Sequence, residues 1–267
     1  MDRRPIGVFD SGLGGLTAVR ELMRLLPGED IVYFGDTGRV PYGSRSRDTI
    51  IKYARQDVAF LRTFDLKAIV IACGTVSTTA LEVLEAENAI PILGVVGPAV
   101  AEAAAATRCG KVGLIGTQAT IRTRAYEKAL ARLQPGAEVI ALACPLLVPL
   151  VENGRFRPGD RVAELVVEEY LSPVKAAGVD TLVLGCTHYP LLADVIRAYM
   201  GPEVTLVNSG AACARQVAAL LEANEGHCPG IRRYFVSDRV DDFSVLASLF
   251  LGEDVRGDVE QVDITLY

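Results

Sequence analysis

Two cysteines stand at matching points of two similar segments, and they are the residues best suited to chemistry in this sequence. Cys73 closes the apolar run of "KAIVIACGTVS", and Cys186 closes that of "DTLVLGCTHYP". A threonine follows each of them within two residues, and His188 follows the second. A lone cysteine at the end of a strand is more often a small core hydrophobe than a catalytic group. Because the pattern occurs twice, we interpret both thiols as functional.

Opposed thiols suit one class of reaction in particular. A proton that leaves one face of a carbon atom and returns to the other face inverts the configuration, and two acid/base groups on opposite sides do this directly. A thiol is a base only as the thiolate, so it needs a neighbouring cation or hydrogen bonds that lower its pKa. His188 can supply such a charge. Hydrolysis by a nucleophilic cysteine needs one thiol and leaves the other unexplained.

Short apolar or β-branched runs alternate along the chain with longer amphipathic segments, which is typical of βα units around parallel sheets. We expect strands at residues 6–10, 30–36, 68–73, 91–96, 111–117, 138–144, 181–186, 204–209 and 232–237. We expect helices at residues 15–26, 47–64, 76–88, 97–107, 120–133, 160–176, 190–200, 211–223 and 240–251. So many strands in 267 residues favour an α/β fold of two similar parallel-sheet domains that face each other across a cleft.

Polar clusters follow several of these strands. Ligands of open α/β sheets bind beyond the carboxyl ends of the strands, so such clusters are the expected site. The segment "VPYGS" is a loop whose backbone amides can also face a ligand. The clusters are Asp10 with Ser11, Cys73 through Thr75, Thr117 with Thr120, and Cys186 through His188.

The glycines of "DSGLGGLTA" allow two interpretations. Their spacing does not match the dinucleotide fingerprint, whose third glycine would fall at Thr17, and the lysine of a Walker motif is missing. One interpretation is a tight turn from strand to helix. The other, favoured by Asp10 and Ser11 at the same strand end, is a helix start whose amides bind an anion.

Composition argues against several classes of protein. A net charge of -6 argues against a nucleic-acid partner, which normally demands a basic face. No apolar run approaches the ~20 residues that cross a bilayer, and the N-terminus lacks the pattern of a signal peptide. We therefore expect a cytoplasmic protein without a membrane partner. The six cysteines form no CxxC pair, and only His188 and His227 could join them, so we expect no metal site.

Five segments together resemble the glutamate racemase family, in the order that the family shows them: "IGVFDSGLGGLTAVREL", "YFGDTGRVPYGSRS", "IVIACGTVS", "VPLVENG" and "TLVLGCTHYPLL". The resemblance runs from Ile6 to about residue 251. It implies a cofactor-independent, usually homodimeric enzyme of the bacterial cytosol that interconverts L- and D-glutamate and supplies D-glutamate for peptidoglycan. It also implies two α/β domains related by a pseudo-twofold axis, with the active site between them. The first would hold residues 1–97 plus 208–267, and the second residues 98–207.

The same resemblance implies roles for individual residues. Cys73 would take the α-proton from D-glutamate, and Cys186 would take it from L-glutamate. Asp10 and His188 match the auxiliary groups beside the two thiols, and Glu152 matches an acid that assists His188. The positions that match substrate contacts are Asp10, Ser11, Pro41, Tyr42, Gly43, Gly74, Thr75, Thr117, Thr120, Thr187 and His188.

Gly74 departs from the family, which commonly has asparagine after the first cysteine. The missing carboxamide removes a side-chain hydrogen bond to substrate, a loss on the order of 1–3 kcal/mol where the partner is left unpaired. This leaves open a related racemase or isomerase that acts on aspartate or another dicarboxylate. A different alternative is a non-catalytic two-lobed protein that closes on a small anion, with both thiols inert.

Overall fold

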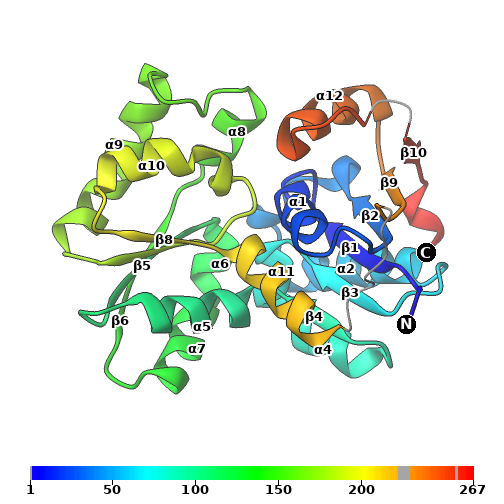
Figure 1. Ribbon diagram of the computed structural model, residues 1–267, viewed down its shortest axis with the longest axis horizontal. Coiled ribbons are helices and arrows are strands. Elements are labelled where there is room, and N and C mark those ends of the chain that lie inside the picture. Colours follow the sequence, from blue (N-terminus) through cyan, green and yellow to red (C-terminus); the bar gives the residue numbers. More distant parts are fainter. Residues whose placement is uncertain (1, 222–228, 256–257) are drawn as a thin grey trace.

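Two parallel sheets form the framework of the molecule (Figure 1). The computed structural model describes residues 2–221, 229–255 and 258–267. One sheet has the strand order β10-β9-β2-β1-β3-β4, and the other has the order β6-β5-β7-β8. The strands are β1 (Ile6–Asp10), β2 (Ile31–Gly35), β3 (Ala68–Ile71), β4 (Ile92–Gly94), β5 (Lys111–Gly116), β6 (Glu138–Ala143), β7 (Thr181–Leu184), β8 (Thr205–Asn208), β9 (Arg232–Val236) and β10 (Val259–Gln261).

The two sheets repeat one topology. The segment β2-β1-β3-β4 of the first sheet has the same order as β6-β5-β7-β8, so β3 corresponds to β7 and β1 to β5. The pair β3 and β7 carries the two similar segments that end in Cys73 and Cys186. Strands β1, β2, β3 and β7 are buried along their whole length, as expected for parallel strands covered on both faces. The prediction of two similar parallel-sheet α/β domains is confirmed.

Helices cover both faces of each sheet (Figure 1). They are α1 (Leu16–Leu25), α2 (Arg47–Leu61), α3 (Gly74–Thr79), α4 (Leu81–Glu87), α5 (Val96–Ala106), α6 (Gln118–Thr123), α7 (Ala125–Leu133), α8 (Leu147–Glu152), α9 (Arg161–Ala176), α10 (Ala193–Met200), α11 (Ser209–Leu220) and α12 (Val240–Leu251). Short 3₁₀ turns lie at Thr37–Arg39, Tyr42–Ser44, Tyr189–Leu192 and Ile264–Leu266. Within the described residues, no helix combines the length and apolar character of a membrane span.

All nine predicted strands are present, but some of the predicted helices differ. The helix expected at 76–88 is divided into α3 and α4, and the one expected at 120–133 is divided at Arg124, whose φ of 55° is left-handed. Two elements were not predicted: α8, a short apolar segment that contains a proline, and β10, a three-residue edge strand. The last two residues of the helix expected at 211–223 lie outside the described residues, as do His227 and Cys228.

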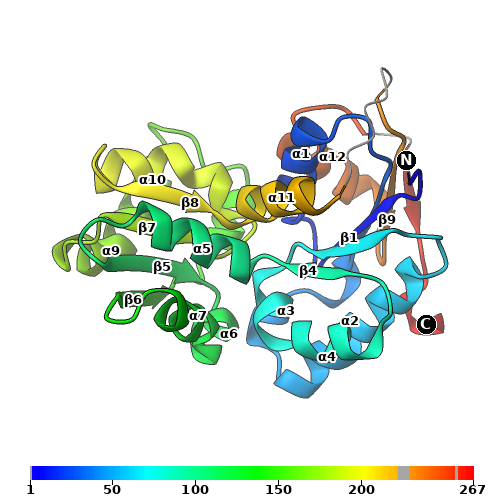
Figure 2. The same ribbon diagram turned by 60° about the horizontal axis from the view of Figure 1, so that its bottom comes forward.

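The chain crosses from the first sheet to the second between β4 and α5, and it returns through α11 (Figure 2). Helix α11 packs against both α1 and α5 and so contacts both halves. Gly210 at its start lies against Ala18 of α1, where an added Cβ would come within 3.1 Å of the Ala18 Cβ. One apolar cluster includes Val8 of β1 and Leu182 of β7, so the two halves share part of their core.

Candidate active site

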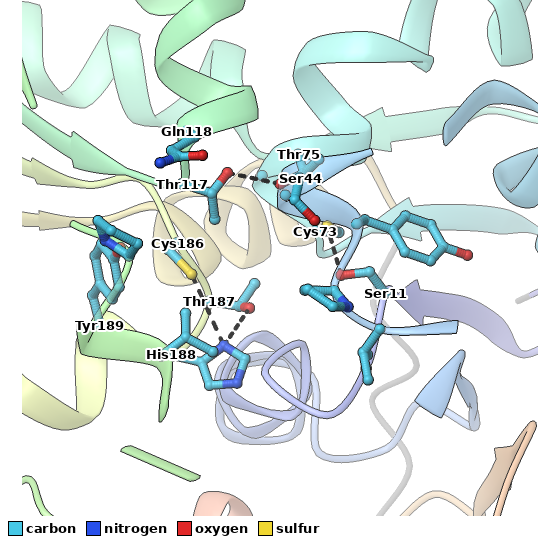
Figure 3. A pocket seen from close by; sticks show the side chains of 18 of the residues that line it. Ser11, Ser44, Cys73, Thr75, Thr117, Gln118, Cys186, Thr187, His188 and Tyr189 are labelled. Atoms are coloured by element: carbon cyan, nitrogen blue, oxygen red, sulfur yellow. Dashed lines mark hydrogen bonds between the residues drawn. The ribbon is translucent and has the colours of Figure 1, made fainter. Parts of the chain in front are cut away.

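A cavity of about 410 Å³ lies where the carboxyl ends of strands from both sheets meet (Figure 3). Cys73 follows β3 and Cys186 follows β7, and Figure 3 shows them on opposite sides of this space. Most of the predicted site residues line it: Ser11, Pro41, Tyr42, Gly43, Cys73, Gly74, Thr75, Thr117, Glu152, Cys186, Thr187 and His188. Asp10 and Thr120 do not line the cavity and are almost fully buried.

On the first side, Cys73 lies beside a hydroxyl and near a buried carboxylate. Its Sγ is 3.2 Å from Ser11 Oγ. Asp10 Oδ2 accepts a hydrogen bond from the Gly15 amide at 2.9 Å, whereas Asp10 Oδ1 is buried and has no partner among the described residues. Burial and then the negative charge of Asp10 raise the pKa of Cys73 to about 12. The surroundings of Cys73 therefore favour the thiol over the thiolate.

On the second side, His188 links Cys186 to Glu152. The Nδ1 atom of His188 lies 3.9 Å from Cys186 Sγ and 3.5 Å from Thr187 Oγ1, and Nε2 lies 3.0 Å from Glu152 Oε1. Burial lowers the pKa of His188, but the hydrogen bonds and charges of Cys186 and Glu152 outweigh it and raise that pKa to about 10. A histidine that is charged at neutral pH favours the thiolate form of a neighbouring cysteine.

Glu152 reaches this site from an element that the strand-and-helix pattern did not predict. It is the last residue of α8, and the same segment supplies Pro145, Val148 and Pro149 to the cavity wall. Phe250 of α12 lies against the His188 ring from another direction, edge to face, with the ring centroids 5.5 Å apart. Neither α8 nor α12 shows a local signal for these contacts, because both join the site through packing.

Threonine hydroxyls connect the two halves of the cavity. Thr75 Oγ1 lies 3.0 Å from Thr117 Oγ1 (Figure 3). Thr117 Oγ1 in turn lies 3.1 Å from Thr120 Oγ1. Thr117 also caps α6, because its hydroxyl accepts a hydrogen bond from the Thr120 amide at 3.2 Å. Thr117 is thus the member of the pair that faces the cavity, and Thr120 stands behind it.

The glycine segment before α1 packs closely instead of presenting free amides. The amides of Leu16, Thr17 and Ala18 donate to carbonyls within the turn, and that of Gly15 donates to Asp10. These four amides are thus satisfied within the protein, which favours the tight-turn interpretation for the start of α1, whereas Ser11 and Gly12 of the same segment line the cavity. A Cβ on Gly14 would overlap Thr187 and His188, and Thr17 Oγ1 donates to the Thr187 carbonyl at 2.8 Å.

Gly74 makes the corresponding close approach on the other side of the cavity. A Cβ at this position would overlap the carbonyl oxygen of Gly185, the residue directly before Cys186. The residue after Cys73 therefore contacts the residue before Cys186, and this contact joins the two domains. An asparagine at position 74 would need a wider separation of these two strand ends, so the glycine belongs to the spacing seen here.

The described residues contain no group of three or more histidine, cysteine or acidic side chains that could hold a metal ion. What they bring together is a pair of thiols, each with its own proton-carrying or hydrogen-bonding neighbours, on two sides of one small cavity.

This arrangement defines a two-domain α/β protein built for acid/base chemistry on a small molecule held between the domains. Residues 15–217 match the model of the Asp/Glu/Hydantoin racemase family, and the chain belongs to this family. A glutamate racemase from Geobacter metallireducens is 48% identical over 99% of this chain and 98% of its own length.

Solved structures lead to the same family. A glutamate racemase isoform from Bacillus anthracis superimposes with a TM-score of 0.92 at 38% identity, with 98% of each chain covered. The glutamate racemase from Francisella tularensis, solved in complex with D-glutamate, gives a TM-score of 0.91 at 38% identity and covers 100% of both chains.

Proposed function

We propose that this protein is a glutamate racemase that interconverts L- and D-glutamate without a cofactor. The observation that carries the proposal is the position of Cys73 and Cys186, which follow corresponding strands of a duplicated fold and line one cavity from opposite sides. The likeness to glutamate racemases over the whole chain, one of them holding D-glutamate, supports the choice of substrate.

In the direction from L- to D-glutamate, Cys186 is the base. Before the transfer, the positive charge of His188 balances the negative charge of the Cys186 thiolate. The thiolate then takes the α-proton, and the electrons of the broken C–H bond remain on the substrate as a carbanion. Glu152 helps to raise the pKa of His188 through their hydrogen bond. The Cys73 thiol, whose pKa of about 12 keeps it protonated, then donates its proton to the opposite face. This step leaves Cys73 as the thiolate and Cys186 as the thiol. In the reverse direction that Cys73 thiolate takes the α-proton from D-glutamate, and the Cys186 thiol donates its proton to the opposite face.

The carbanion needs preorganised donors, since an amino-acid α-proton is weakly acidic. In this proposal, the hydroxyls of Thr75, Thr117 and Thr187 and the amides of the Pro41–Ser44 loop hold the substrate carboxylates. Asp10 Oδ1, buried and without a partner among the described residues, is suited to the substrate ammonium group or to the Cys73 thiol. Ser11 completes the surroundings of Cys73.

The proposal extends to the setting of the enzyme. We assign residues 1–97 plus 208–267 to the domain of Cys73 and residues 98–207 to that of Cys186. We propose that the enzyme supplies D-glutamate for peptidoglycan precursors and therefore works in the cytoplasm. We also propose that it acts as a homodimer. None of these assignments is needed for the reaction itself.

Circular dichroism of the purified protein with L-glutamate tests the reaction. We expect the signal to decay to that of the racemate without added cofactor, and we expect Cys73→Ala and Cys186→Ala each to abolish the decay. Turnover of aspartate faster than glutamate would instead favour the related dicarboxylate racemase. Absence of any racemisation, together with tight binding of glutamate, would favour the non-catalytic protein.

A further inference from the structure

A buried network of charged and polar side chains lies behind the loop that lines one wall of the cavity. The loop is Pro41–Ser44, and the network consists of Asp36, Arg39, Tyr42 and Asp57; we call these four residues the loop-anchor network. Asp36 directly follows β2, and Asp57 belongs to α2. Only Tyr42 of the four lines the cavity.

Arg39 holds both carboxylates of the network. Its guanidinium donates to Asp36 Oδ2 at 2.6 Å and to Asp57 Oδ1 at 2.9 Å. It also lies over the ring of Tyr53, with 4.2 Å between the Cζ atom and the ring centroid. Both carboxyl groups are fully buried, so water does not compete for their hydrogen bonds to Arg39.

Tyr42 connects this buried group to the loop. Its hydroxyl donates a hydrogen bond to Asp36 Oδ2 and lies 3.2 Å from Asp57 Oδ2. The 3₁₀ turn Tyr42–Ser44 has no side-chain cap at its start, and its end is held by the Arg45 amide, which donates to the Tyr42 carbonyl at 2.9 Å. The Tyr42 hydroxyl is therefore the side-chain tie between the cavity-facing turn and the protein interior.

The charges of the network raise the question of whether one of its two carboxyl groups is protonated. Two carboxylates and one guanidinium have an excess negative charge, and a fully buried excess charge is costly. Burial and the charge of Asp36 raise the pKa of Asp57 well above its ordinary value. A protonated Asp57 can donate to the Tyr42 oxygen while the Tyr42 hydroxyl donates to Asp36, which satisfies all three oxygens.

We propose that the loop-anchor network positions the Pro41–Ser44 loop for substrate binding, with Asp36, Arg39 and Asp57 acting through the Tyr42 hydroxyl. This inference rests on the proposed function, in which the loop holds a substrate carboxylate. Asp36, Arg39 and Asp57 are positioning residues, because they are not part of the cavity wall. Gly43 lets the loop pack closely against Thr117, since a Cβ added at Gly43 would lie 3.1 Å from the Thr117 Cβ.

The first test compares Tyr42→Phe with Tyr53→Phe. The two rings are neighbours, 5.3 Å apart, but only the Tyr42 hydroxyl belongs to the network. We expect Tyr42→Phe to raise the KM for glutamate about tenfold, the equivalent of one hydrogen bond, with kcat changed less than about twofold. Tyr53→Phe should leave both constants unchanged. A lower melting temperature with an unchanged KM would show a purely structural role and overturn the proposal.

Asp57 provides the second variant pair. Asp57→Asn keeps the shape of a neutral carboxyl group and can donate to Tyr42, so we expect a KM within about twofold of the wild type. Asp57→Ala removes the contacts and should raise KM as Tyr42→Phe does. If Asp57→Asn is as damaging as Asp57→Ala, the residue acts as a charged carboxylate, and the neutral form assigned here is wrong. This pair also decides the proposal if Tyr42→Phe does not fold.

Hydrogen exchange of the loop separates this inference from the proposed function. We expect the peptide that contains residues 40–46 to exchange faster in Tyr42→Phe and Asp57→Ala than in the wild type and Tyr53→Phe, whether or not the protein is active. Unchanged exchange in both variants overturns the positioning role. A wild type that does not racemise glutamate, but whose loop loosens in these variants, contradicts the proposed function and leaves the network's role in place.

Discussion

Replacing Glu152 by glutamine should lower the pKa of His188 by about one unit. The glutamine keeps the shape of the side chain and removes the negative charge 3.0 Å from His188 Nε2. A hydrogen bond to a charged group is worth about 1.5–3 kcal/mol, and we take the lower end because the Glu152 side chain is 38% exposed. Since one pKa unit corresponds to about 1.4 kcal/mol, the pKa of His188 should fall from about 10 to about 9.

The assay is an NMR titration of the imidazole resonances. The chain has only two histidines, so His227→Gln identifies the His188 signal and serves as the matched control. We expect His188 to titrate near pH 10 in the wild type and near pH 9 in Glu152→Gln. A His188 that titrates near 6.5 in the wild type, or whose pKa is the same in both proteins, would refute the role given to Glu152.

The same change has a consequence for stability. The folded-state pKa of His188 is raised above its ordinary 6.5, so this group stabilises the fold fully below about pH 6.5 and loses that contribution as the pH rises towards 10. Urea unfolding should therefore show Glu152→Gln to be less stable than the wild type by about 1.4 kcal/mol at pH 6. The difference should vanish above pH 10. A difference that does not depend on pH would point to lost packing instead of lost charge.

Two further predictions concern the cavity walls. Thr117→Val removes the cap of α6 and the hydroxyl next to Thr75, so we expect a loss of about 1 kcal/mol in urea unfolding and a higher KM for glutamate; unchanged values of both would contradict the assigned contacts. Cys73, whose pKa is about 12, should be alkylated slowly at pH 7 and about tenfold faster for each unit of higher pH, as followed by mass spectrometry of its peptide. Rapid labelling of Cys73 at pH 7 would contradict its burial as a neutral thiol.

The strands and the two thiol positions are predictable from the sequence, because the signals for them are local. A run of β-branched and apolar residues predicts a buried parallel strand without knowledge of its neighbours. The echo between the segments around Cys73 and Cys186 is local too, and it corresponds to the equivalent strands β3 and β7. The ends of helices were less predictable, since the break at Arg124 depends on a single left-handed residue.

The side chains that support the site depend on contacts between residues far apart in the chain. Glu152 lies 36 positions from His188, and Asp57 lies 15 positions from Tyr42, and each pair meets through packing. The interpretation of Gly74 also depends on the tertiary structure. The sequence shows a missing carboxamide, whereas the structure shows a glycine whose missing Cβ leaves room for the Gly185 carbonyl.

The sequence by itself thus determined that two thiols end matching strands of a duplicated α/β fold. It did not determine their protonation states. A thiol acts as a base only as the thiolate, yet the pKa of Cys73 is raised, because its Sγ is buried near the Asp10 carboxylate. A pKa depends on solvent exclusion and on charges within a few ångströms, and only the tertiary structure decides which groups those are.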